Sequence, residues 1–194
     1  KWGSQGSANG QFLYPSGIDI NQSGFVYVTD SDNHRIQVFD ANGNFITKWG
    51  SQGSDDGQFN LPEDIAFNQS GFVFVTDYHN HRVQVFDANG NFITKWGSQG
   101  SANGQFSYPY SIAINQSGFV YVTDILNNRI QVFDSNGNFI AKWGSGGSGG
   151  GQFDQPCGVT VNQSGFVYVA DTYNHRIQVF SPLYAATSLG AQGT

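Results

Sequence analysis

Short apolar runs of four to six residues follow one another along the whole chain. Each run is rich in Val, Ile, Phe and Tyr and is bounded by Gly, Asn, Asp or Ser, which is typical of β-strands that end in turns. The first runs are Ile18–Ile20, Phe25–Thr29, Ile36–Phe39 and Phe45–Trp49. No stretch has the length and period of an amphipathic helix, so the pattern predicts an all-β protein.

The apolar pattern returns at a regular interval. Trp2, Trp49, Trp96 and Trp143 are each 47 residues apart, so the chain reads as four copies of one unit. We expect a single repeat domain over residues 1–194, with repeats at approximately 2–48, 49–95, 96–142 and 143–189, and residues 190–194 as the stub of a further repeat. Within the last repeat, residues 184–189 are interpreted as a weak final strand. The near-identity of the units indicates recent duplication or deliberate construction, and both origins stay open.

Each unit carries four predicted strands, here called a to d in chain order. Asn42-Gly43 separates strands c and d and recurs in the next two units, which predicts a hairpin because Asn and Gly both tolerate positive φ. A single four-stranded sheet cannot bury both of its faces, whereas sheets stacked around an axis can. The sequence therefore predicts a β-propeller of four-stranded antiparallel blades, with four blades per chain.

The units largely share a set of residues, which in the first unit are Gly10-Gln11-Phe12, Pro15, Ile18, Gly24, Val26-Tyr27-Val28, Asp30, Asn33, Arg35-Ile36-Gln37-Val38-Phe39 and Gly43. This set resembles the pattern of the NHL-repeat family of β-propellers. The resemblance covers all four repeats and departs only in the C-terminal tail. It implies a propeller fold, and it implies function weakly, because NHL propellers range from protein- and RNA-binding modules to lyases.

Composition narrows the class of protein further. Aromatic residues make up 15% of the chain and charged residues 11%, which argues against disorder. No run of 18 apolar residues occurs, and the net charge is −6, so we expect a soluble protein that binds neither a membrane nor nucleic acid. The single Cys, Cys157, excludes an internal disulfide framework. The start at Lys-Trp-Gly-Ser and the lack of Met suggest a mature or excised segment, and no compartment is indicated.

The four units differ mainly in two connections. The d–a and b–c loops are expected at one end of the blades, here called the loop end, and they carry most of the acidic residues outside the repeated frame. Loops on a rigid scaffold often bind ligands. The loop end is thus a candidate site for a sugar, a cation or a basic peptide, although the acids can equally serve solubility alone. The candidate ligand-binding residues are Asp19, Glu63, Asp64, Tyr14, Tyr78, Tyr108, Tyr110 and Tyr173.

A second set of polar residues belongs to the frame itself. An Asp-x-x-Asn-x-Arg motif recurs in every unit, and four equivalent copies favour a structural role over a single catalytic site. We expect the Asp to bond the turn and the Arg to reach back to it. The motif residues are Asp30, Asn33 and Arg35; Asp77, Asn80 and Arg82; Asp124, Asn127 and Arg129; Asp171, Asn174 and Arg176.

No catalytic residue, metal site or cofactor is predicted. His34, His81 and His175 share one column and are interpreted as solvated turn residues rather than metal ligands. Cys157 has no repeated base near it in sequence, so a nucleophile is not expected. The resemblance implies that a lyase of this family would hold a central metal on strand-a residues. The corresponding positions here are Asp19, Ala66, Ala113 and Thr160, and only the first can ligate a metal.

The number of repeats raises a question of ring closure, because NHL propellers most often have six blades. An open ring leaves two apolar blade faces wet; if each exposes roughly 500 Å², the cost is about 25 kcal/mol. We therefore expect a homo-oligomer, with a head-to-tail dimer of eight blades favoured. A closed four-bladed monomer and a six-bladed ring of shared blades remain alternatives. The predicted function is a non-enzymatic scaffold or protein-interaction module that closes its ring by self-association.

Overall fold

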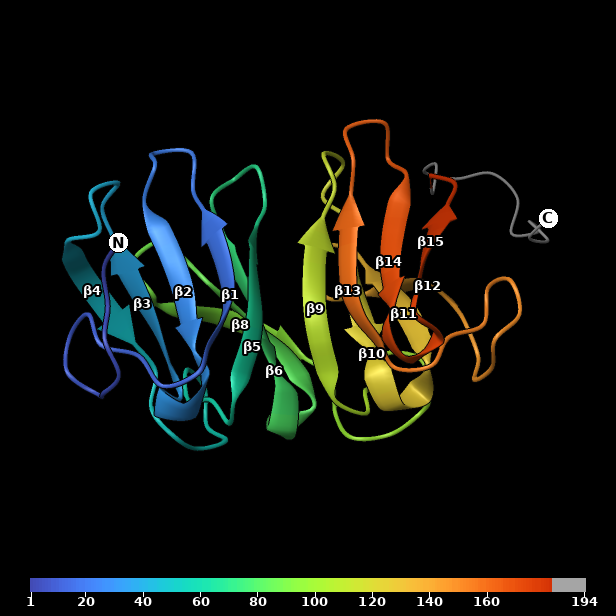
Figure 1. Cartoon of the computed structure of the whole chain (residues 1–194), viewed down its shortest axis with the longest axis horizontal. Helices are drawn as coiled ribbons and strands as arrows, with labels where there is room; N and C mark the ends of the chain where they lie inside the picture. Colours follow the sequence, from blue (N-terminus) through green and yellow to red (C-terminus); the bar gives the residue numbers. More distant parts are fainter. Residues whose placement is uncertain (183–194) are drawn as a thin grey trace.

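The computed structural model describes residues 1–182, which form four antiparallel sheets (Figure 1). The chain is an all-β, four-blade propeller, as the sequence predicts. The first two blades are β1 (Pro15–Ile20), β2 (Val26–Asp30), β3 (Arg35–Phe39) and β4 (Phe45–Trp49), then β5 (Pro62–Phe67), β6 (Val73–Asp77), β7 (Arg82–Phe86) and β8 (Phe92–Trp96). The last two are β9 (Pro109–Ile114), β10 (Val120–Asp124), β11 (Arg129–Phe133) and β12 (Phe139–Trp143), then β13 (Pro156–Val161), β14 (Val167–Asp171) and β15 (Arg176–Phe180).

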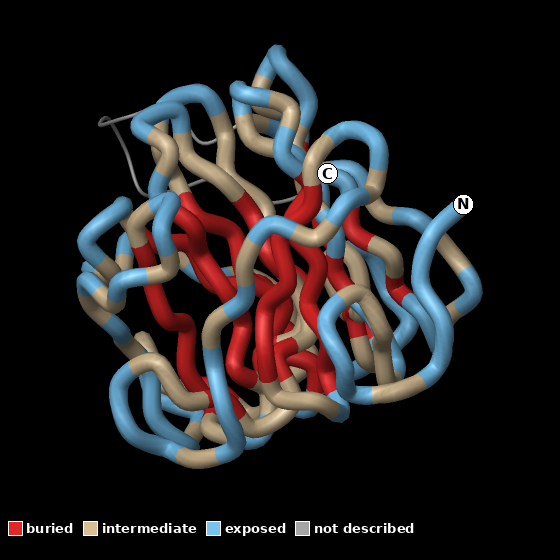
Figure 2. The backbone as a smooth tube through the Cα atoms, turned by 90° about the vertical axis from the view of Figure 1, so that its left-hand side faces the viewer, coloured by how far each residue is buried: buried red, intermediate tan, exposed pale blue. Residues whose placement is uncertain are grey.

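Sheet order follows chain order in every blade, so each blade is a simple meander. Strands b and c are joined by short 3-10 turns, namely η1 (Ser31–Asn33), η2 (Tyr78–Asn80), η3 (Ile125–Asn127) and η4 (Thr172–Asn174). The middle strands of the first three blades are buried along their full length, and the exposed backbone gathers at the turns (Figure 2). The predicted final strand over residues 184–189 lies outside the described residues.

Strand a begins earlier than the apolar run indicates. The apolar run predicts a start at Ile18, yet β1 starts at Pro15, which pairs with Asp30. The register then shifts at a β-bulge before Ile18 pairs with Val28. The Thr29 hydroxyl lies opposite the bulge, where its oxygen accepts a hydrogen bond from the Gly17 N–H at 2.6 Å.

The hairpin between strands c and d is present, but with a different backbone from the one predicted. Gly43 N–H bonds the Asp40 carbonyl at 3.0 Å and Asp40 N–H bonds the Asn44 carbonyl at 3.0 Å, so the turn is longer than two residues. Gly43 has a φ of +83°, whereas Asn42 is not among the residues with positive φ. Only the Gly of the Asn-Gly pair uses a positive φ, and Asp40 Oδ1 accepts the Asn42 and Asn44 N–H groups and closes the turn.

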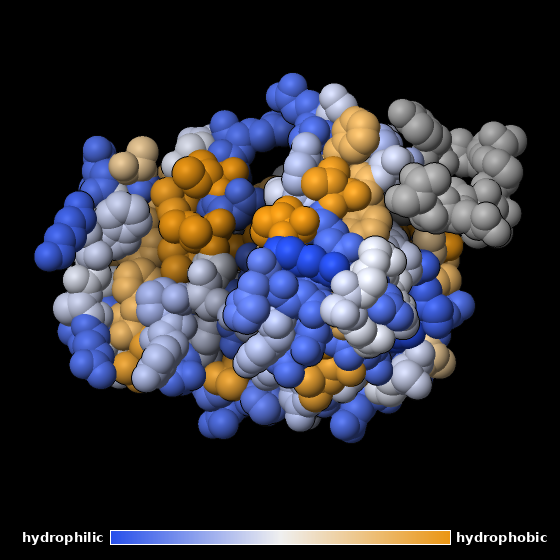
Figure 3. Space-filling view, turned by 45° about the vertical axis from the view of Figure 1, so that its right-hand side comes forward, coloured by the Kyte–Doolittle hydropathy of each residue, from blue (hydrophilic) through white to orange (hydrophobic). Residues whose placement is uncertain are grey.

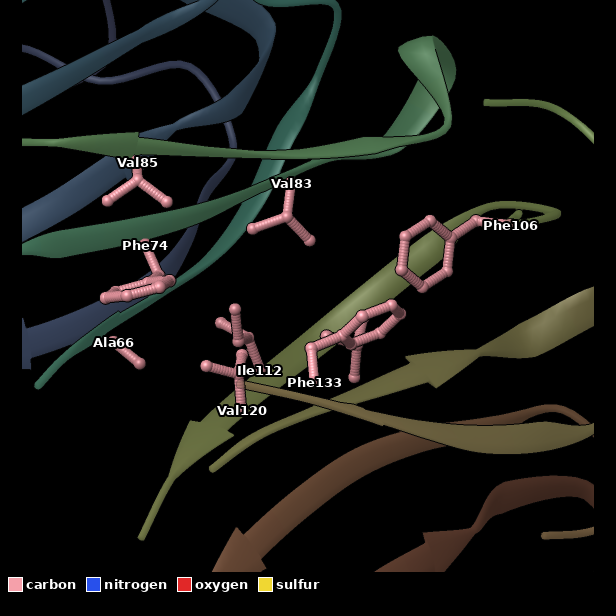
Figure 4. Close-up of a cluster of buried hydrophobic side chains, with 9 residues drawn as sticks. Ala66, Phe74, Val83, Val85, Phe106, Ile112, Val120 and Phe133 are labelled. Atoms are coloured by element: carbon pink, nitrogen blue, oxygen red, sulfur yellow. The ribbon is translucent and has the colours of Figure 1, made fainter. Parts of the chain in front are cut away.

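The core lies between blades rather than within one blade. Between the second and third blades, Phe74 and Val83 face Ile112 and Phe133 across the interface (Figure 4). The other two interfaces use the same columns of the repeat. Each blade thus has an N-side face, which packs on the preceding blade, and a C-side face, which packs on the following blade.

The four blades form an arc. Strands β1, β5, β9 and β13 line its inner side in sequence order, and each contacts the next (Figure 1). No comparable contact joins β1 to β13 in the part of the chain that the structure describes. The N-side face of the first blade and the C-side face of the fourth are therefore left without a neighbouring blade. Among residues 1–182, no helix has the length and apolar character needed to cross a membrane.

Candidate functional site

The repeated Asp-x-x-Asn-x-Arg motif forms a buried network under each b–c turn. In the first blade, Asp30 Oδ2 accepts hydrogen bonds from Arg35 Nε at 2.7 Å and from Gln37 Nε2 at 2.9 Å. Asp30 Oδ1 accepts the Leu13 N–H at 2.7 Å, which ties the incoming d–a loop to the turn. The same Arg then donates to the carbonyls of Ser7, Ala8 and Gln11.

The other blades repeat this network. The Arg Nε to Asp Oδ2 distance is 2.7 Å in all four copies. The Asp carboxylate is fully buried throughout, but the Arg differs. In the first three blades its side chain is at most 7% exposed, whereas Arg176 in the fourth blade is 31% exposed. Every carboxylate and guanidinium of the motif is thus committed to holding a turn, which is a structural use.

The loop end of the second and third blades brings several candidate ligand residues together. Tyr78 lies 4.8 Å from Tyr108 and 5.9 Å from Tyr110, measured between ring centroids. The Glu63 carboxylate lies close enough to raise the pKa of both Tyr78 and Tyr110, after burial, which is the larger cause. This group is not repeated elsewhere in the chain, because the columns carry different residues in other units.

The acidic candidates are less exposed than expected. Burial raises the pKa of Glu63, and a hydrogen bond with Ser16 opposes that shift. Burial also raises the pKa of Asp64, whose Oδ2 accepts bonds from the Ser111 hydroxyl at 2.8 Å and the Ile112 N–H at 2.9 Å. Asp19 Oδ2 likewise accepts the Phe67 N–H at 3.2 Å. Asp19 and Asp64 therefore join adjacent inner strands, and Glu63 is the acid that lies with the tyrosines.

Tyr14 and Tyr173 do not join this group. Tyr14 lies at the open side of the first blade and is 77% exposed, and Tyr173 lies in the last b–c turn and is 60% exposed. The prediction grouped them with the other tyrosines because all of them fall in variable columns. Column membership cannot indicate which blade a residue faces, so it could not separate the two end tyrosines from the others.

The His column has a role that the sequence analysis missed. His34 Nδ1 accepts the Leu61 N–H and His81 Nδ1 accepts the Tyr108 N–H, both at 3.2 Å. In the third blade Asn128 Oδ1 accepts the Gln155 N–H at 2.9 Å. The interpretation as solvated turn residues was wrong for His81, which is buried. A signal was available: His and Asn, the two types in this column, can both accept a backbone N–H.

No group of three or more His, Cys, Asp or Glu side chains is placed to hold a metal ion within residues 1–182. Three of the four strand-a positions that the family resemblance pointed to, Ala66, Ala113 and Thr160, carry no carboxylate or imidazole. The fourth, Asp19, already accepts bonds from the Ile20 and Phe67 N–H groups. The described inner strands thus offer no set of metal ligands.

The N-side face of the first blade is the first of two exposed apolar surfaces. Ile18 is 60% exposed, whereas its counterparts Ile65, Ile112 and Val159 in the other blades are buried. Trp2, Phe12, Leu13, Tyr14 and Pro15 line a groove of about 420 Å³ at the edge of this face.

The C-side face of the fourth blade is the second. Ile177 is 63% exposed, and Tyr168 and Val179 beside it are also exposed. Their counterparts in the first blade, Ile36, Tyr27 and Val38, are buried against the second blade. In the space-filling view, apolar side chains gather into patches among the polar ones (Figure 3).

Two solved structures with this fold have longer chains than this one. Virginiamycin B lyase from Staphylococcus aureus superposes with a TM-score of 0.63 at 16% identity, covering 86% of this chain and 55% of the lyase chain. A nidogen/laminin complex structure gives a TM-score of 0.68 at 20% identity, covering 87% of this chain and 60% of the matched chain. The chain thus spans just over half of each neighbour, and the likeness shows the propeller fold.

Sequence relatives match over about one repeat. The B-box type zinc finger protein ncl-1 of Caenorhabditis elegans is 51% identical over 45 residues, which is 23% of this chain and 5% of that protein. Protein brain tumor of Drosophila melanogaster is 47% identical over 45 residues, 23% of this chain and 4% of that protein. The matches therefore cover only a small part of these much longer proteins.

A family model described as NHL repeat matches four times, at residues 12–39, 59–86, 106–133 and 153–180. Each match begins at the Phe that precedes strand a and ends at the last Phe of strand c. The four matches together cover more than half of the chain and include one copy of the Asp-x-x-Asn-x-Arg network each. The chain belongs to the NHL repeat family.

Proposed function

We propose that the protein is a non-enzymatic interaction module whose two end faces bind a second copy head-to-tail, so that two chains close a ring of eight blades. The observation that carries this proposal is the complementarity of the end faces. Ile18 and Phe12 on the N-side face correspond to residues that are buried in every internal interface. On the C-side face, Tyr168, Ile177 and Val179 correspond to Tyr27, Ile36 and Val38. Those three residues of the first blade pack against the N-side face of the second blade.

The internal interfaces supply a geometry for this contact within one chain. Between the first and second blades, Tyr27, Ile36 and Val38 pack against Phe59 and Ile65. A second copy that presents its fourth blade to the first blade repeats these pairs with residues of the same size and polarity. Fully burying one Ile or Val side chain stabilises an interface by about 1.5–3 kcal/mol, and apolar side chains are exposed to water on each end face.

The proposal of a non-enzymatic role rests on how the polar side chains are used. The buried Asp and Arg groups occur in four equivalent networks, each holding a turn. Asp19 and Asp64 accept backbone N–H groups of the next blade. The chemically capable groups of the frame are thus engaged in the architecture, and the large free surfaces are apolar.

Two complementary variants test the head-to-tail contact. Ile18→Asp places a charge on the N-side face, and Ile177→Asp places one on the C-side face. A head-to-tail pair has two contacts, each between one N-side face and one C-side face. In a pair made of one variant, each contact includes one altered face, so each variant alone should remain monomeric. An equimolar mixture retains one contact between two intact faces, so it should form a heterodimer that multi-angle light scattering detects.

The matched control is Ile93→Asp, since Ile93 is about half exposed and lies on β8, away from both end faces. This variant should associate as the unaltered chain does. A mixture of the two end-face variants that stays monomeric, or end-face variants that associate as well as the control, would contradict the head-to-tail contact.

A second candidate function is favoured by one specific observation, the cluster of Tyr78, Tyr108 and Tyr110 beside Glu63. Aromatic rings with a carboxylate suit a sugar or a basic side chain, because a sugar stacks on the rings and a cation is attracted to both groups. We propose this cluster, without Tyr14, Tyr173, Asp19 or Asp64, as the ligand-binding part of the loop end.

Maltotetraose and a tetra-lysine peptide are suitable probes, titrated by calorimetry against the unaltered chain and Glu63→Gln. A basic-peptide site predicts that Glu63→Gln weakens binding of the peptide. A sugar site predicts that Tyr110→Ala weakens binding of maltotetraose. Failure of both probes to bind the unaltered chain would reject this second function for both ligand classes.

A further inference from the structure

We infer that Tyr14 of one copy inserts between Tyr173 and His175 of a second copy and forms the polar edge of the closing contact. This inference rests on the head-to-tail pairing proposed above and adds the residues that set its register. It is carried by an internal counterpart of the same contact, at the interface of the second and third blades, and by the exposure of both partners.

The internal counterpart is the packing around Tyr108. Its ring centroid lies 5.5 Å from that of His79 with an interplanar angle of 85°, and 4.6 Å from that of His81. His79 and His81 belong to the b–c turn of the second blade, and Tyr108 belongs to the d–a loop of the third. The turn of one blade thus holds an aromatic residue of the next blade.

The end residues occupy the same columns. Tyr14 lies two repeats before Tyr108, and Tyr173 and His175 lie two repeats after His79 and His81. The first blade has therefore kept the inserting aromatic residue, and the fourth blade has kept the turn that receives it. Both sides are exposed in the single chain, with Tyr14 at 77% and Tyr173 at 60%.

The backbone of Tyr14 is already in the conformation that the contact needs. Its φ is +49°, and the counterparts Leu61, Tyr108 and Gln155 have φ values of +56°, +63° and +50°. Those three residues each donate their N–H to the His or Asn of the preceding turn. In the second copy the corresponding acceptor is His175 Nδ1, and within residues 1–182 neither this atom nor the Tyr14 N–H has a hydrogen-bond partner.

The groove beside Tyr14 matches the incoming turn. Its walls include Trp2 and Pro15. Trp49, the counterpart of Trp2, ends β4 and lies between the first two blades: its ring centroid is 5.9 Å from that of Tyr27 in the first blade and 5.8 Å from that of Phe86 in the second. At the counterpart of Pro15, the Ser31 hydroxyl of the first blade donates to the Pro62 carbonyl of the second at 2.6 Å. In the closing contact Tyr168 therefore packs edge-on against Trp2, and the turn Thr172–Asn174 fills the groove.

Sedimentation analysis of a dilution series tests the inference. Aromatic pairs are worth about a factor of ten each beyond their buried area, and a head-to-tail dimer contains the contact twice. Tyr14→Ala and Tyr173→Ala should therefore each raise the dimer dissociation constant by about a hundredfold. The double variant should lose little more than either single variant, because the two rings contact each other.

Leu126→Ala is the matched control, since Leu126 is the exposed counterpart of Tyr173 in the third blade and lies away from both end faces. A dimer whose dissociation constant responds equally to Tyr14→Ala, Tyr173→Ala and Leu126→Ala would overturn the inference and leave self-association standing. Fully additive losses in the double variant would overturn the direct contact. An unaltered chain that is monomeric at every concentration would overturn the pairing itself.

Discussion

At the scale of single residues, the same side chain can be buried in one blade and exposed in another. The Asp–Arg pair has one geometry in all four copies, yet the Arg is nearly inaccessible in the first three and partly exposed in the fourth. The sequence predicted the pairing from spacing alone, because the motif recurs without change. It could not predict the difference in exposure, since that depends on which blade has a neighbour.

This difference predicts unequal effects of one substitution. Arg82→Met leaves the buried Asp77 carboxylate without its cation, and removing one partner of a buried pair costs about 3–5 kcal/mol. At a concentration at which the protein is monomeric, Arg176→Met should cost distinctly less, because water reaches the site of its 31% exposed side chain. Urea unfolding at neutral pH measures both. Equal losses would show that burial does not control the strength of this pair.

Glu63 gives a prediction about pH. Burial raises the pKa of its carboxyl above the ordinary value, so ionisation costs more in the folded state than in the unfolded state. This destabilisation is absent below the pKa of the unfolded state. It increases as the pH rises above that value and is complete above the pKa of the folded state. Glu63→Gln should therefore be more stable than the unaltered chain at pH 7 and no more stable at pH 3, as measured by urea midpoints. An advantage that is independent of pH would assign the effect to something other than charge.

At the scale of the elements, turns set the limits of each blade. Gly90 in the c–d turn has a φ of +84°, and a Cβ there would lie 2.6 Å from the Trp49 ring. Gly71 in the a–b turn has almost the same φ, +81°, but its surroundings are open. Comparing substitutions at Gly71 and Gly90 therefore separates the cost of backbone strain from the cost of close packing between units.

Alanine at these two positions should give different losses. Gly71→Ala should cost about 1 kcal/mol, the price of a left-handed backbone for an L-residue. Gly90→Ala should cost about 1–3 kcal/mol more, because the Trp49 ring must move. Thermal or urea unfolding of the two variants compares them directly. The same loss at both glycines would mean that the Trp ring adapts without strain.

The strands were the most predictable elements. Alternating apolar residues between Gly- and Asn-containing turns placed strands b, c and d close to their observed bounds. Strand a was predicted too short, because Pro15 to Gly17 carry no apolar pattern and enter the sheet through a bulge. The interblade role of His34 and His81 was also missed, because the shared ability of His and Asn to accept a backbone N–H does not by itself indicate which loop supplies that N–H.

At the scale of the whole molecule, the repeat produces two unlike ends from near-identical units. Every internal interface joins a C-side face to an N-side face, so a chain of four blades ends with one of each. The sequence predicted the number of blades and the problem of closure. The candidate loop end was predicted only in part, because three-dimensional packing selects Glu63, Tyr78, Tyr108 and Tyr110 and separates them from Tyr14 and Tyr173.

The central claim is that the two end faces bind each other between two chains. Light scattering coupled to size-exclusion chromatography measures the solution mass over a range of concentrations. The account predicts about 42 kDa, twice the chain mass of 21.1 kDa. A mass of 21.1 kDa at every concentration would contradict it and would show that the exposed end faces are stable in water.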